Sequence, residues 1–139
     1  MAIYTCFSEL CTSEANEPKL LISLQLLLLL LPIPNRIILK DTLNLLNKTA
    51  AHENCNKMNC DTLATLFTPH LLCPRKLSPE ALHINSQMLS GLVAFMIKKG
   101  NELFQIPPKL FTDIRAFWVK QEKKLLTQDE PDVIKTYFI

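Results

Sequence analysis

Residues 56–72 read Asn-Lys-Met-Asn-Cys-Asp-Thr-Leu-Ala-Thr-Leu-Phe-Thr-Pro-His-Leu-Leu, and this stretch predicts a short helix between two loops. Asn59 is a suitable N-cap, because its side-chain oxygen can accept a hydrogen bond from a backbone N–H one turn on. Proline has no backbone N–H to donate, so we expect Pro69 and Pro74 to end the helix and stiffen its exit.

The apolar residues of this short helix follow a helical spacing. Leu63, Leu66 and Phe67 stand at i, i+3 and i+4, which places them on one face. We expect that face to enter a core.

The composition favours an all-α fold in one domain. The chain has 139 residues, of which 48% are hydrophobic, only 7% are aromatic and two are glycines. Abundant leucine favours helices over a sheet, and two glycines cannot build a glycine-rich phosphate loop. The net charge of +2 is too small to indicate a nucleic-acid partner.

Four more segments have helical patterns, at residues 19–31, 34–51, 78–104 (with a possible break) and 109–126. The third begins with Ser-Pro-Glu, which is typical of a capped helix start, whereas residues 1–18 have no clean periodicity. The expected inner faces are Leu39, Leu43, Leu46 and Ala50, then Leu89, Leu92, Val93, Met96 and Ile97. In the last segment Leu110, Ile114, Phe117, Trp118 and Leu125 lie roughly on one side.

The most apolar segment, residues 19–31, can be interpreted as a membrane span or as a buried helix. A membrane span needs about 20 apolar residues, but this run is shorter, contains Ser23 and Gln25, and ends at Pro32 and Pro34. We therefore favour a buried helix.

Residues 56–72 also resemble the signature of the Rho-type GTPase-activating (Rho-GAP) domain family, with Thr62 where the family usually has Asn and Thr68 where it often has Gly. The run at 31–39, Leu-Pro-Ile-Pro-Asn-Arg-Ile-Ile-Leu, resembles the family's entry into the preceding helix. Residues 67–74 and 94–98 most resemble the branch that contains Rho GTPase-activating protein 19.

This resemblance implies a partial Rho-GAP helical bundle of about five helices and a role in regulating Rho-family small GTPases in signal transduction. We expect residues 1–18 to be an unassigned leader, 19–106 the C-terminal part of the domain, and 107–139 a helical extension and tail. The GTPase-facing residues implied by motif position are Asn56, Thr62, Pro69 and His70. Asn56 has the alternative role of bonding its own loop, and Pro69 of ending the helix.

The family's catalytic arginine lies near the start of the domain, and we expect it to be absent here. An inserted arginine stabilises the charge on the transferring phosphoryl group. The arginines of this chain are Arg36, Arg75 and Arg115, and none precedes the first recognised helix. We therefore expect a truncated or alternatively spliced member that binds or competes rather than catalyses, with no catalytic residue and no cofactor.

Two other kinds of site are considered. The cysteines and histidines at His52, Cys55, Cys60, His70 and Cys73 offer zinc ligands, but their spacing is irregular, so no metal site is expected. A nucleophilic cysteine is less favoured still, because no nearby sequence motif supplies a histidine base and a third group to orient that base. The odd number of cysteines, five, indicates a reducing compartment, and we expect a cytoplasmic protein.

The alternative function is a membrane-associated adaptor or scaffold. It would use the Leu-rich helix 20–31 and the basic C-terminal helix, where residues 98–124 hold seven basic and three acidic side chains, a net charge of +4.

Overall fold

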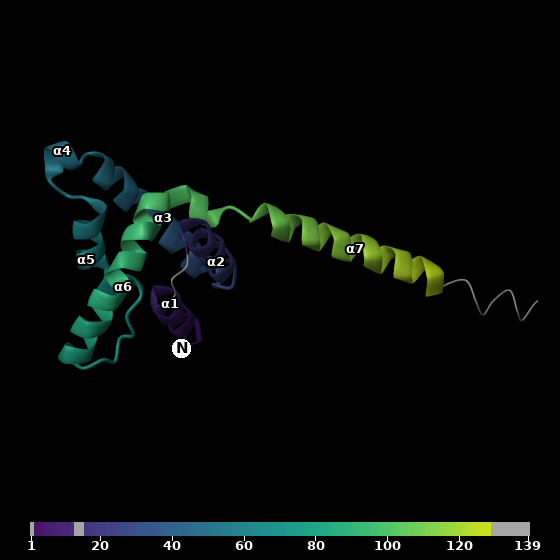
Figure 1. Cartoon of the computed structure of the whole chain (residues 1–139), viewed down its shortest axis with the longest axis horizontal. Helices are drawn as coiled ribbons and strands as arrows, with labels where there is room; N and C mark the ends of the chain where they lie inside the picture. The colour runs from purple at the N-terminus through teal and green to yellow at the C-terminus, as the bar shows by residue number, and fades with distance from the viewer. Residues whose placement is uncertain (1, 13–15, 129–139) are drawn as a thin grey trace, which may run out of the picture. The chain divides into compact units, whose positions relative to one another are not determined.

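The computed structural model describes residues 2–12 and 16–128, and the chain forms two compact units, Met1–Gln105 and Ile106–Ile139. The secondary structure of the described part consists of helices without a strand, which confirms the all-α prediction. The first unit contains α1 (Ala2–Thr12), α2 (Glu17–Leu29), α3 (Ile33–Ala51), α4 (Glu53–Asn56), α5 (Cys60–Leu71), α6 (Pro79–Lys99) and the 3₁₀ helix η1 (Gly100–Phe104), and the second contains α7 (Pro108–Gln128) (Figure 1).

Local capping sets the helix starts that the sequence predicts. The Oδ1 atom of Asn59 accepts a hydrogen bond from the backbone N–H of Thr62 at 2.8 Å, and Ser78 Oγ accepts one from the N–H of Ala81 at 3.2 Å. Each satisfies a backbone donor that the first turn of a helix leaves unpaired. The predicted break in the long helix is also present, because α6 ends where Gly100 takes a φ of 52° and the chain tightens into η1.

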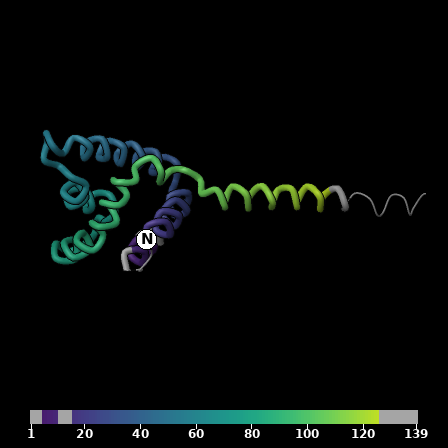
Figure 2. Tube along the Cα trace, turned by 45° about the horizontal axis from the view of Figure 1, so that its top comes forward, coloured from purple at the N-terminus to yellow at the C-terminus, as the bar shows by residue number. Residues whose placement is uncertain are grey.

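The first unit is organised around α6. Helix α5 packs along α6, α3 contacts α5, α6 and η1, and α1 contacts α6 and α2. Figures 1 and 2 show α1 beside α2 from two directions. The buried hydrophobic residues are Phe7, Leu24, Leu27, Leu28, Leu43, Leu46, Leu63, Ala64, Leu89, Leu92, Val93, Ala94, Met96, Ile97 and Leu103.

Two expectations for α5 are wrong. The helix does not end at Pro69, which lies inside its last turn, and it continues to Leu71. This is tolerated because the helix has only two residues left, so the missing N–H removes a single helical hydrogen bond. Leu66 does not enter the core and is 53% exposed, whereas Ala64 and Thr68 are fully buried. The buried face of α5 is therefore rotated from the expected one.

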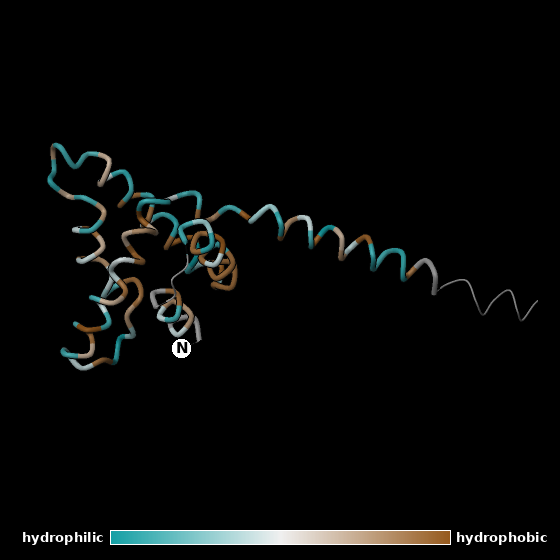
Figure 3. Tube along the Cα trace, viewed as in Figure 1, coloured by the Kyte–Doolittle hydropathy of each residue, from teal (hydrophilic) through white to brown (hydrophobic). Residues whose placement is uncertain are grey.

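The Leu-rich segment is a core helix, as predicted. Figure 3 shows most of α2 in the hydrophobic colour. Leu24, Leu27 and Leu28 are buried, and the side chain of Gln25 is buried too, where its Nε2 donates to the carbonyl oxygen of Glu102 at 2.8 Å. In the described part of the chain, no helix is both long enough and apolar enough to cross a membrane.

Helix α1 lies in the segment for which the sequence predicted no element. Its Phe7 is 3% exposed and belongs to the core. Glycine and proline are absent from residues 2–12, which permits a helix there, but the docking of α1 on α6 comes from tertiary packing.

Candidate functional site

The loop before α5 is held together by the side chain of Asn56. Its Nδ2 donates to the carbonyl oxygen of Thr49 at 2.8 Å, and its Oδ1 accepts from the backbone N–H of Met58 at 2.8 Å. Between them Lys57 has a φ of 60°, in the left-handed region. Asn56 therefore uses both ends of its amide to bridge the end of α3 to the tight turn that precedes α5, so its loop-bonding role is present.

Three of the sequence's interface residues lie on α5. Thr62 and His70 are exposed, and Pro69 is half-buried. At 100° per residue, Thr62, Leu66 and Pro69 follow one another along the helix face opposite the buried one, over about 10 Å. We call these three residues the outer ridge of α5. Sequence reasoning missed Leu66 as a surface residue, because its i+3 spacing from Leu63 suits either edge of an apolar face.

A groove of about 520 Å³ borders the outer ridge between α5 and α6. Pro69 and Thr65 form one wall of this groove, and the remaining lining residues are Pro79, Leu82, His83, Ser86, Gln87 and Ser90.

A second hollow, of about 400 Å³, lies at the end of α5 and contains His70. Arg75 also lines it, together with residues of α1 and α3 and Leu31 from the turn between α2 and α3. Pro69 and His70 are adjacent in sequence but line different hollows, so the structure does not gather the four predicted residues into one pocket. The site is better described as a convex ridge with a hollow beside it, a shape that suits a protein partner more than a small molecule.

The geometry gives no support to the hypothesis of a zinc site. Within residues 2–12 and 16–128, no group of three or more His, Cys, Asp or Glu side chains is placed to hold a metal ion. The described thiols of Cys6, Cys55, Cys60 and Cys73 are free. Burial raises the pKa of the Cys60 thiol, and the negative charge of Asp61 raises it further, which disfavours the reactive thiolate.

The signature stretch thus forms a capped helix with an outward ridge, and comparison with known proteins identifies its family. A family model described as RhoGAP domain matches residues 2–76. The chain belongs to the RhoGAP family. The match begins within residues 1–18 and ends before α6. The boundaries predicted at residues 18 and 106 stay predictions.

The most similar relatives include members of the branch that the sequence indicated. Rho GTPase-activating protein 19 of Homo sapiens is 41% identical over 123 residues, which cover 88% of this chain and 25% of the relative. The protein of the same name from Gallus gallus is 38% identical over 123 residues, covering 84% of this chain and 25% of the relative. Rho GTPase-activating protein 40 of Mus musculus is 36% identical over 96 residues, or 67% of this chain and 14% of the relative.

The chain spans about a quarter of the length of the Rho GTPase-activating protein 19 relatives. No solved structure matches it.

The arginines of this RhoGAP chain lie at three separate places. Arg36 is half-buried in the first turn of α3, Arg75 is exposed in the loop after α5, and Arg115 is exposed on α7. Arg75 is the one that shares a hollow with a predicted interface residue, His70.

Proposed function

We propose that this RhoGAP chain binds the GTP-loaded form of a Rho-family small GTPase through the outer ridge of α5, with Asn56 and His70 at its margins. The observation that supports this most is that α5 has one side buried in the core and an opposite side that exposes an apolar residue. The inward residues of α5 form core contacts with α6, while Leu66 stands 53% exposed between Thr62 and Pro69. An exposed apolar side chain, here next to the apolar ring of Pro69 and the polar Thr62, is the kind of residue found at the centre of a protein interface that has a polar rim.

We propose further that binding by this chain gives little acceleration of GTP hydrolysis, so that it acts in the cytoplasm as a competitor rather than an activator. An inserted arginine contributes about 10³–10⁵ in rate to GTPases. No arginine precedes Arg36 in these 139 residues. In addition, Thr62 occupies the position where the family usually has Asn, and a hydroxyl cannot make the two-sided amide hydrogen bonds of an asparagine.

The test is single-turnover GTP hydrolysis by a panel of purified Rho-family GTPases, with and without the purified chain, alongside titration of each GTP-loaded GTPase to measure binding. Saturable binding without acceleration is the expected result. Binding with a large rate gain would overturn the non-catalytic part. In that case Arg36→Ala, Arg75→Ala and Arg115→Ala variants would show which guanidinium supplies the charge.

Absence of binding to every GTPase in the panel, by a chain whose circular dichroism is helical and whose unfolding is cooperative, would overturn the binding part. The fold must be checked because exposed apolar surface promotes self-association, and α2, α3 and the turn between them expose Ile22, Leu26, Leu30, Ile37 and Ile38.

The alternative function, a membrane-associated adaptor, was based on the Leu-rich helix and on the basic C-terminal helix, and the structure argues against a membrane role for the first. Leu24, Leu27 and Leu28 are core residues of the folded unit, so α2 cannot insert them into a bilayer without unfolding. The basic C-terminal helix is considered by itself below.

A further inference from the structure

Helix α7 presents a stripe of large apolar side chains to solvent. Phe111, Ile114, Phe117, Trp118 and Leu125 are each between 46% and 62% exposed. The rings of Phe117 and Trp118 pack edge to face with centroids 5.8 Å apart, so they form one joint aromatic surface. With Leu110, which is half-buried, these residues are the α7 stripe.

The stripe occupies one side of the helix. At 100° per residue, its members fall within an arc of about 120°, and Gln121 is a polar residue inside that arc. Sequence analysis placed five of these six residues roughly on one side of the helix, and their exposed fractions show that the described part of the second unit leaves most of this side uncovered.

The rest of the helix surface is mainly polar and basic, with Val119, which is 45% exposed, as an apolar exception. Helix α7 contains five basic and two acidic residues, a net charge of +3. Arg115 and Lys124 lie close to the two edges of the stripe, and Lys109, Lys120 and Lys123 lie on the opposite side.

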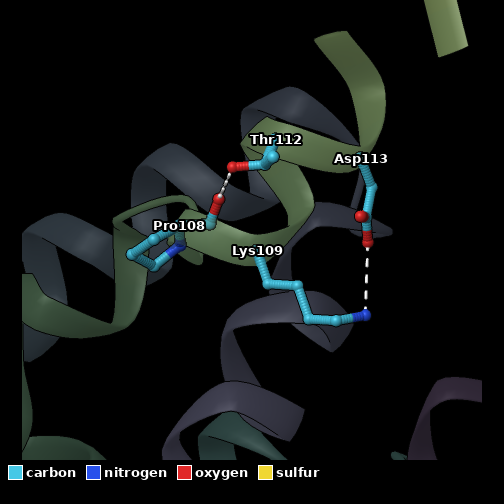
Figure 4. Close-up of polar contacts among 4 residues, drawn as sticks. All are labelled: Pro108, Lys109, Thr112 and Asp113. Carbon is cyan, nitrogen blue, oxygen red and sulfur yellow. Dashed lines mark hydrogen bonds and ion pairs between the residues drawn. The ribbon is translucent and has the colours of Figure 1, made fainter. Parts of the chain in front are cut away.

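The first turn of α7 shows how the polar side is arranged. Figure 4 shows Lys109 reaching Asp113, with 3.4 Å between Nζ and Oδ2, and the Thr112 hydroxyl donating to the carbonyl oxygen of Pro108 at 3.1 Å. The Lys109 and Asp113 side chains are 89% and 60% exposed, so this ion pair lies in solvent and contributes little to stability. This side of α7 is therefore suited to water, and the stripe is the side that needs a partner.

We propose that α7 is an interfacial helix that lies flat on an anionic lipid bilayer, with the stripe in the acyl boundary and the lysines toward the headgroups. An amphipathic helix with Trp and Phe on one face and Lys and Arg on the other is the type that binds such surfaces. This inference goes beyond the proposed GTPase binding and uses a different part of the chain. Its 21 residues would cover about 30 Å of membrane surface.

Charge complementarity favours an anionic bilayer over a second copy of the chain. Two α7 helices paired through their stripes would bring two net charges of +3 together. On an anionic bilayer each basic residue near the surface strengthens binding by about fivefold, so a net charge of +3 contributes roughly a hundredfold. Long lysine side chains can also extend toward the headgroups while their stems cover apolar surface.

The test is co-sedimentation of the whole chain with vesicles of phosphatidylcholine mixed with phosphatidylserine, and with vesicles of phosphatidylcholine alone. Trp118 is the one tryptophan in the sequence and lies in the stripe, so its fluorescence reports insertion directly. We expect strong binding and a blue shift of Trp118 emission with the mixed vesicles, and binding weaker by about a hundredfold with phosphatidylcholine alone.

Two variants with the same change of charge separate insertion from simple attraction. Ile114→Asp places a carboxylate in the stripe, and Ala116→Asp places one on the opposite, exposed side of the same helix. We expect Ile114→Asp to weaken binding to the mixed vesicles by at least tenfold more than Ala116→Asp does, with circular dichroism confirming that both remain helical.

Four results would overturn the proposal, three of them from the experiments above. These three are an equal loss in the two variants, which would mean charge attraction without insertion, binding to neither kind of vesicle, and concentration-dependent dimers that protect Trp118 in the absence of lipid. Tight capture by an acidic helix-binding protein without vesicle binding would also overturn it.

Discussion

The side-chain amide of Asn47 donates a hydrogen bond of 2.9 Å to the carbonyl oxygen of Ile97, and so ties the last turns of α3 to the C-terminal end of α6. The same nitrogen lies 3.4 Å from the carbonyl oxygen of Lys98. The last carbonyls of a helix have no partner within it, so a donor from a neighbouring helix satisfies them. This contact fixes the position of α3, and therefore of the Asn56 loop that follows it.

Replacing Asn47 by alanine should destabilise the first unit by about 1–2 kcal/mol, because a partly buried carbonyl loses its donor. Chemical denaturation followed by circular dichroism measures this. The matched control is Asn44→Ala, the same substitution one turn earlier on α3, which leaves the hydrogen bond to Ile97 in place and should cost less. Equal losses in the two variants would show that the contact contributes nothing specific.

The two glycines of the chain should respond in opposite directions to alanine. Gly100 has a φ of 52°, and a Cβ there would meet the Cγ and Nδ2 atoms of Asn47 at 3.4 Å. We expect Gly100→Ala to cost about 1–3 kcal/mol in the free energy of unfolding. Gly91 lies within α6 with nothing within 4 Å of an added Cβ, so Gly91→Ala should stabilise by about 0.5–1 kcal/mol. Thermal unfolding of both variants decides the matter, and a stabilising Gly100→Ala would contradict the observed backbone.

Leu66→Asp should weaken binding to a GTP-loaded Rho-family GTPase by tenfold or more, since it places a charge at the centre of the outer ridge. Leu66 is largely exposed, so the free energy of unfolding should change by no more than about 0.5 kcal/mol. The control is Leu45→Asp, the same change at a leucine that is 64% exposed on α3. Titration of each variant against the GTPase tests this, and a comparable loss in Leu45→Asp would move the interface away from α5.

The Cys60 thiol should require a higher pH to react in the folded chain than in the unfolded one. Burial, and then the charge of Asp61, raise its pKa above the ordinary value of 9.0. The raised pKa also means that Cys60 contributes stability below pH 9, which is lost as the pH rises through the folded-state pKa. Alkylation of Cys60 across a pH series, followed by mass spectrometry with and without urea, measures the shift. Identical profiles in the two conditions would contradict it.

Much of the first unit could be predicted because its signals are local. The caps at Asn59 and Ser78, and the inner residues Leu43 and Leu89, depend on neighbours within one or two turns, and all four are where the sequence indicated. The candidate site was harder to predict from the sequence. Thr62 and Pro69 were predicted from motif position alone, and only the folded unit shows that they lie beside the exposed Leu66.

The sequence by itself determined the family, the all-α class and the principal helices from α2 onward, since periodicity, capping and a gapless signature are properties of consecutive residues. Tertiary structure decided which face of each helix is covered. Helix α6 covers Leu63 and Phe67 but leaves Leu66 outside, and it receives Phe7 from a helix with no clear pattern. Among the residues of the second unit that the structure describes, none covers the α7 stripe. An apolar face only requires some partner, and the identity of that partner depends on residues distant in sequence.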